Sequence, residues 1–114
     1  MKVKHYVDVP AEPAAEAPGV AIRWLIAQSS GADNFAMRVI EVQPGAATPF
    51  HTHPFEHEAY VLEGVGGLRT EDKEMPLRVG SFAFVPPDIK HQFVNRGEAP
   101  LRFICVIPMP EEEH

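Results

Sequence analysis

Twelve prolines and eight glycines interrupt the 114-residue chain at short intervals. Proline breaks a helix and glycine weakens one, and no segment keeps a helical periodicity without meeting either residue. The stretches between them are rich in Val, Ile and Phe, and several alternate between apolar and polar residues, as half-buried strands do. The predicted strands are 20–28, 34–42, 59–63, 81–85, 91–95 and 101–107. Many short strands separated by turn signals favour an all-β barrel or sandwich.

The length of the chain suits one domain with one hydrophobic core. We therefore expect a single domain, 1–114, with its barrel core at about 20–108. The Ala/Pro/Glu-rich stretch 10–19 is predicted to be a loop that contributes no regular strand ladder. The acidic stretch 110–114 is predicted to be a solvated tail.

Charge and cysteine content exclude several classes of partner. The formal net charge of −6 and the lack of a basic stripe argue against a nucleic-acid partner. No apolar run is long enough for a signal peptide or a membrane span, so no membrane partner is expected. Cys105 is the only cysteine, which excludes an internal disulfide and suits a reducing compartment. These features predict a cytoplasmic protein.

Histidines cluster in the segment 45–64. His51 and His53 are two residues apart, so on a strand both side chains would leave the same face. Pro54 then interrupts the strand, and His57 begins the next apolar run. Two imidazoles on one face, with a third donor on an adjacent strand, are an arrangement by which a barrel interior builds a metal site.

A second segment, 80–95, supplies a fourth histidine. The tight turn predicted at 86–88 would deliver His91 at the start of a strand. A buried cluster of imidazoles without a ligand would be costly to desolvate. We therefore predict one divalent metal ion bound by His51, His53, His57 and His91.

The two segments resemble the two sequence motifs of the cupin superfamily. The matching residues are Gly45, His51, His53 and Gly64 in the first motif, and Gly80, Pro86, His91 and Asn95 in the second. The family commonly has glutamate at the third ligand position, where this chain has His57. A shift of register could bring Glu56 or Glu58 there instead, but the spacing fits His57 without adjustment. Asp88 replaces a glycine of the motif, and aspartate tolerates the left-handed conformation better than most residues.

The resemblance implies a jelly-roll-like antiparallel β-barrel, a homodimer, and Mn(II) or Fe(II) as the metal; imidazole also accepts Co, Ni, Cu and Zn. In the dimer, the segment Lys4–Val9 is expected to extend the sheet of the partner. Four neutral imidazoles would leave the charge of the ion uncompensated, which favours an anionic oxygen ligand. Four donors around a six-coordinate ion would also leave two open positions, as in catalytic sites.

Two further residues are candidates for a catalytic role. Glu58 is the best placed of the nearby glutamates to act as a general base. If Arg102 faces solvent, alternation along 101–107 turns Cys105 toward the interior of the barrel, where it could line the metal cavity.

By resemblance, the predicted function is metal-dependent catalysis on a small oxygen-rich or anionic molecule, with a dioxygenase-like oxidoreductase favoured over an oxalate-decarboxylase-like enzyme. The alternative is a non-enzymatic domain that binds or senses a small molecule or a metal. A metal-free sugar isomerase or epimerase is a third possibility, against which the complete set of four histidines argues.

Overall fold

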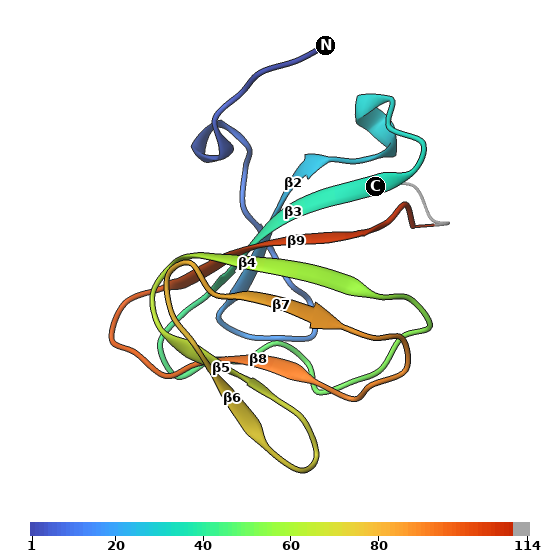
Figure 1. Ribbon diagram of the computed structural model, residues 1–114. Coiled ribbons are helices and arrows are strands. Elements are labelled where there is room, and N and C mark those ends of the chain that lie inside the picture. Colours follow the sequence, from blue (N-terminus) through green and yellow to red (C-terminus); the bar gives the residue numbers. More distant parts are fainter. Residues whose placement is uncertain (111–114) are drawn as a thin grey trace.

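The computed structural model describes residues 1–110, which form two antiparallel sheets stacked as a jelly roll. The larger sheet has the strand order β1-β2-β3-β9-β4-β7 and the smaller one has the order β6-β5-β8 (Figure 1). The strands are β1 (Glu12–Pro13), β2 (Val20–Ile26), β3 (Phe35–Val42), β4 (His57–Glu63), β5 (Gly66–Arg69), β6 (Glu74–Leu77), β7 (Phe82–Val85), β8 (Gln92–Asn95) and β9 (Leu101–Pro108). The 3-10 turns are η1 (Tyr6–Asp8) and η2 (Gln28–Ser30).

The predicted all-β jelly roll is confirmed, although the described strands do not close into one continuous barrel. The connection 43–56 crosses between the sheets, and its strand-like pairing is limited to the isolated bridges Ala47–Val94 and His51–His91. Prolines at positions 44, 49 and 54 lack the N–H groups that a continuous ladder would need. The acidic tail was predicted for residues that lie, apart from Pro110, outside the described part of the chain.

The six predicted strands correspond to β2, β3, β4, β7, β8 and β9, with boundaries within a few residues. The prediction of a loop without strand pairing at 10–19 was wrong at one point, because β1 pairs with β2. The hairpin β5–β6 was missed because Gly66 and Gly67 have low strand propensity. A Cβ atom at position 66 would lie 2.4 Å from the Val94 carbonyl oxygen, so the close approach of β5 and β8 requires glycine there.

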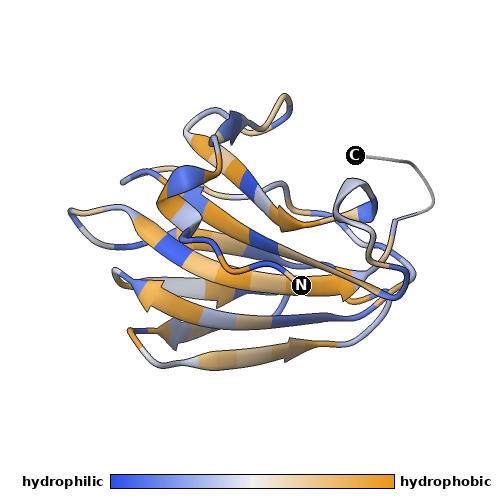
Figure 2. Cartoon of the chain, turned by 90° about the horizontal axis from the view of Figure 1, so that it is seen from above, coloured by the Kyte–Doolittle hydropathy of each residue, from blue (hydrophilic) through white to orange (hydrophobic). Residues whose placement is uncertain are grey.

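The core lies between the sheets and is organised around β9. Its residues alternate strictly, with Leu101, Phe103, Cys105 and Ile107 buried and the residues between them partly exposed. Figure 2 shows hydrophobic residues in orange and hydrophilic residues in blue following one another along the strands. Because β9 pairs with β3 on one side and β4 on the other, these side chains occupy the centre of the larger sheet's inner face.

The outer face of the same sheet carries a buried carboxylate. Glu41 on β3 accepts hydrogen bonds from Arg102 Nε at 2.6 Å and Arg23 Nε at 3.3 Å. Arg23 Nη1 also donates to the Val9 carbonyl at 2.6 Å, which ties the N-terminal segment to the outer face of its own sheet. Residues Tyr6–Asp8 form η1 rather than a strand, so the expected extension of a partner's sheet by Lys4–Val9 stays a prediction.

Among residues 1–110, no helix is both long and apolar enough to cross a membrane.

Asn95 fastens the end of β8 to two other segments. Its Nδ2 donates to the carbonyls of Val42 and Ala99, each at 2.8 Å, and its Oδ1 accepts from the Gly97 N–H at 2.8 Å. The residue is buried, so water cannot replace these bonds without opening the structure.

We predict that Asn95→Ala lowers the free energy of unfolding by about 3 kcal/mol, because it leaves buried backbone groups without partners. Denaturant unfolding measures the loss. The matched control is Asn34→Ala at an exposed position, for which we expect a change within about 0.5 kcal/mol. Equal effects of the two substitutions would contradict this role for Asn95.

Candidate metal centre

Three of the four predicted ligands converge in the structure. His53, His57 and His91 each offer a ring nitrogen, and the three nitrogens lie within 4.8 Å of one another. His57 is the first residue of β4, His91 directly precedes β8, and His53 lies in the connection between the sheets. The cluster therefore joins the two sheets at one end of the jelly roll.

Hydrogen bonds on the far side of the rings orient these imidazoles. His91 Nδ1 donates to the Ile89 carbonyl at 2.7 Å, and His53 Nδ1 donates to the Phe55 carbonyl at 3.1 Å. A carbonyl can only accept, so each Nδ1 carries the proton and each Nε2 keeps its lone pair. This backbone support is the usual arrangement around metal-binding histidines.

His57 is supported by a side chain instead. Its Nδ1 lies 3.1 Å from Cys105 Sγ, and its Nε2 lies 2.5 Å from His53 Nε2. Two nitrogen lone pairs at that separation would repel each other. Three convergent imidazole nitrogens are nevertheless a donor set that suits a divalent transition metal.

Burial keeps the three imidazoles neutral. Desolvation lowers the pKa of His57 to about 3, with further lowering by His53 and Arg38. Desolvation also lowers the pKa of His53 and of His91, although the carbonyls of Phe55 and Ile89 act in the opposite direction. Neutral imidazole is the form that binds a metal, so no proton has to be displaced near neutral pH.

His51 is exposed, and it is not among the histidines whose ring nitrogens converge within 4.8 Å. Its ring centre nevertheless lies 5.4 Å from that of His53, so its role as fourth ligand stays a prediction. The same-face prediction for His51 and His53 assumed a regular strand, whereas His51 makes only an isolated backbone bridge to His91. His51 still borders the cavity that His57 and His91 face.

The glutamates considered as alternative ligands lie outside the cluster. Glu56 and Glu58 are exposed, and Glu58 follows inward-facing His57 on β4, so its side chain leaves the opposite face. Glu58 interacts instead with Glu56, although desolvation is the first cause of its raised pKa. The side chain of Glu58 therefore leaves the face opposite to His57, and a role as catalytic base stays a prediction.

Cys105 is buried on the inner face, as alternation along β9 predicted. It contacts His57 from behind and is not among the residues that line the cavity. Burial raises the pKa of its thiol, while Arg38 acts in the opposite direction. Cys105 therefore contacts His57 from the core, and a catalytic role for its thiol stays a prediction.

His51, His57 and His91 line a cavity of about 340 Å³ between the sheets. This volume is at the lower end of the range for small-molecule sites, which is about 300–1,000 Å³. Its walls are mainly apolar. Apart from the histidines, its ionisable lining residues are Arg38 and Glu16. The residues around it are Ala14, Ala15, Glu16, Val20, Ile22, Arg38, Ile40, Thr48, Pro49, His51, His57, His91 and Phe93.

Sequence reasoning did not identify Arg38. A signal was available in the alternation along β3. Every second side chain of a strand leaves the same face, and the apolar residues in step with Arg38 identify that face as the inner one; they are Ala36, Ile40 and Val42. A charged residue in such a series is a candidate for function, since burying a charge is costly.

The family model described as "Cupin domain" matches residues 38–107. The chain belongs to the cupin family. Protein SchB of Streptomyces halstedii is 30% identical over 118 residues, covering 99% of this chain and 84% of SchB. The tetracenomycin polyketide synthase protein TcmJ of Streptomyces glaucescens is 33% identical over 102 residues, covering 84% of this cupin and 68% of TcmJ.

Solved structures give the same result. The polyketide cyclase RemF from Streptomyces resistomycificus superposes with a TM-score of 0.90 at 38% identity, over 96% of this cupin and 80% of RemF. A predicted oxalate decarboxylase from Thermotoga maritima superposes with a TM-score of 0.83, over 96% of this cupin and all of that chain. At 21% identity the second likeness shows the shared fold.

The lowered pKa values predict that the metal-free protein loses stability in acid. The unfolded chain takes up protons near pH 6.5, whereas folded His57 stays neutral down to about pH 3, so unfolding becomes more favourable as the pH falls below 6.5. We expect His57→Gln to make the free energy of unfolding less dependent on pH between 6.5 and 4.5.

Urea titrations at several pH values, in the presence of a chelator, measure this dependence. The control is His5→Gln at an exposed histidine, which should keep the slope of the original protein. If His57→Gln and the original protein had the same slope, buried His57 would not be the source of the acid sensitivity.

Proposed function

We propose that this cupin binds one divalent metal ion and acts on an enolisable, oxygen-rich substrate of the polyketide type, promoting its cyclisation. The observation that carries the proposal is the convergence of three neutral imidazoles, of which His57 and His91 also line a mainly apolar cavity. The likeness to RemF, a polyketide cyclase, and to TcmJ, a polyketide synthase protein, supports the class of substrate.

In this proposal His53, His57 and His91 hold the metal, with His51 as the fourth ligand after rotation of its exposed side chain. The metal would supply a Lewis acid that polarises a carbonyl oxygen and favours the enolate. Apolar residues exclude water around the substrate; they include Val20, Ile22, Ile40 and Phe93. In the ring closure of a polyketone, an enolate carbon formed by loss of an α proton bonds to a carbonyl carbon. The C=O π bond of that carbonyl opens to an alkoxide, which takes up a proton, so the closure needs no oxidant.

This proposal differs from the dioxygenase-like activity favoured by the sequence. TcmJ and RemF are named for polyketide synthesis and cyclisation, and these two names indicate no oxidation. Mn(II), Fe(II) and Zn(II) all suit three or four imidazoles, so the choice of metal does not separate the two activities. A non-enzymatic binding role differs from both in lacking turnover.

The test uses a β-diketone, 1-phenylbutane-1,3-dione, as the probe. We expect protein loaded with Zn or Mn to bind the probe and to increase its enolate absorption band. His57→Ala and His91→Ala should each lower the metal content, measured by elemental analysis, at least tenfold and abolish the band, because each removes one imidazole from the ligand set and leaves a gap in the coordination of the ion.

The control is His5→Ala, which should keep both the metal and the enolate band. A metal-loaded protein that leaves the probe in its unbound form would contradict the proposed chemistry. An oxygen electrode follows the same samples, and consumption of oxygen with the probe would favour the dioxygenase-like activity instead.

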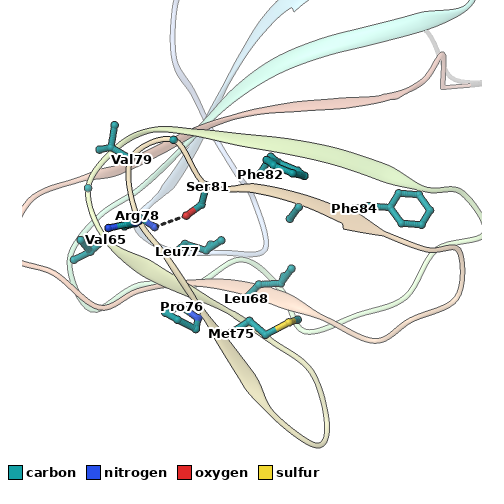
Figure 3. A pocket seen from close by; sticks show the side chains of 13 residues that line it. Val65, Leu68, Met75, Pro76, Leu77, Arg78, Val79, Ser81, Phe82 and Phe84 are labelled. Atoms are coloured by element: carbon teal, nitrogen blue, oxygen red, sulfur yellow. Dashed lines mark hydrogen bonds between the residues drawn. The ribbon is translucent and has the colours of Figure 1, made fainter.

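We also propose that the protein is a homodimer that covers its apolar edge. Phe82 and Phe84 on the edge strand β7 are 83% and 59% exposed. They border a hollow of about 820 Å³ between β7 and β6, whose wall also includes Leu68 and Met75 (Figure 3). An exposed apolar edge strand favours association with another chain.

Light scattering at micromolar concentration should give twice the mass of the chain. The double substitution Phe82→Ser and Phe84→Ser should give a monomer, because it removes the apolar contact. Phe35→Ser, at a phenylalanine that is 67% exposed on β3, should leave the dimer intact. A monomeric mass of the original protein would refute this proposal.

A further inference from the structure

Arg38 brings a positive charge into the cavity between the sheets. It lies on the inner face of β3, where it pairs across the strands with Cys105 of β9 and Trp24 of β2. Its Nη2 donates to Cys105 Sγ at 3.1 Å, and its Cζ lies 5.4 Å from the centre of a Trp24 ring. Neither neighbour carries a negative charge that could neutralise the guanidinium.

The charge of Arg38 has no carboxylate partner among residues 1–110. The arginines that form ion pairs there are Arg23, Arg96 and Arg102, each with a glutamate. Arg38 Nε is buried and has no hydrogen-bond partner within the described part of the chain. An arginine is always charged, and placing it in an apolar surrounding without a counter-ion is unfavourable.

An anionic ligand in the cavity would supply the missing counter-ion for Arg38. Arg38 and the histidines that face the same space would present positive charge from two sides once a metal is bound, and Glu16 is the only acidic residue of the lining. The remaining wall, including Val20, Ile22, Ile40 and Phe93, is apolar and suits a hydrocarbon or aromatic surface.

We propose that Arg38 is the residue that pairs with an oxyanion of the ligand, and that the ligand is an apolar, ring-containing carboxylate or enolate rather than a small polar anion. The proposal deepens the proposed function and rests on it for the reaction, but not for the binding of the anion. Arg38 would orient the ligand so that a second oxygen faces the histidines. The apolar walls would select the ring against a compact anion such as oxalate.

The probe is 3-hydroxy-2-naphthoate, and its uncharged counterpart is 3-hydroxy-2-naphthamide. Isothermal titration calorimetry on metal-free protein should show at least tenfold tighter binding of the acid than of the amide. Arg38→Met should weaken binding of the acid at least tenfold and change binding of the amide less than twofold. Oxalate should bind at least tenfold more weakly than the naphthoate.

Two further variants complete the design. Arg38→Lys keeps the charge and should keep the preference for the acid at lower affinity. Arg78→Met makes the same change of net charge at an exposed arginine and should leave both affinities unchanged. Circular dichroism checks the fold of each variant, and the acid–amide ratio of the original protein needs no substitution.

Equal binding of acid and amide by the original protein would overturn the proposal, as would the failure of both to bind. A preference that survives in Arg38→Met would assign the anion to another residue. The metal is measured separately by elemental analysis on the same samples. A protein that prefers the acid but holds no metal would refute the proposed function and leave the anion site standing.

Discussion

The position of β9 between β3 and β4 is the constraint on which the site depends. Because side chains alternate along β9, every second one points to the inner face of the sheet. The registers with β3 and β4 then determine which residue of each neighbouring strand lies beside it. Cys105 is thereby placed opposite Arg38 on one side and Ala59 on the other, close enough to His57 for a contact of 3.1 Å. A slip of one residue would turn Cys105 and Phe103 to the outer face and remove both the core and the support of His57.

The two faces of this sheet handle buried charge in opposite ways. On the outer face, Glu41 is enclosed by two arginines and the N-terminal segment, so each charge has a partner. On the inner face, Arg38 and the neutral imidazoles of His57 and His91 meet a cavity in whose described lining Glu16 is the acidic residue. The outer arrangement stabilises the fold by itself, whereas the inner one becomes complete only with a ligand, which is typical of a functional site.

Much of this architecture could be predicted from the sequence, because it follows from alternation and turn residues. Alternation placed Cys105 inside, and Asp88 has the left-handed conformation, with φ of 66°, expected at the turn before His91. Alternation gives no reliable placement where no regular strand exists, and His51 and His53 lie in such a segment, where His51 makes an isolated bridge to His91. Because neighbouring residues of a strand point to opposite faces, an inward-facing His57 would have indicated that Glu58 points outward.

What could not be predicted depends on contacts between distant segments. Gly66 looks like a break in the pattern, and only the proximity of the Val94 carbonyl explains it as a strand residue. Likewise, the sequence around Arg38 does not reveal whether a carboxylate from another strand neutralises it. Glu41, three residues later on the same strand, has its partners on the opposite face and is therefore unavailable to Arg38. The separation of these two residues by the sheet itself leaves the inner guanidinium for a ligand, and so connects the register of the strands to the chemistry of the cavity.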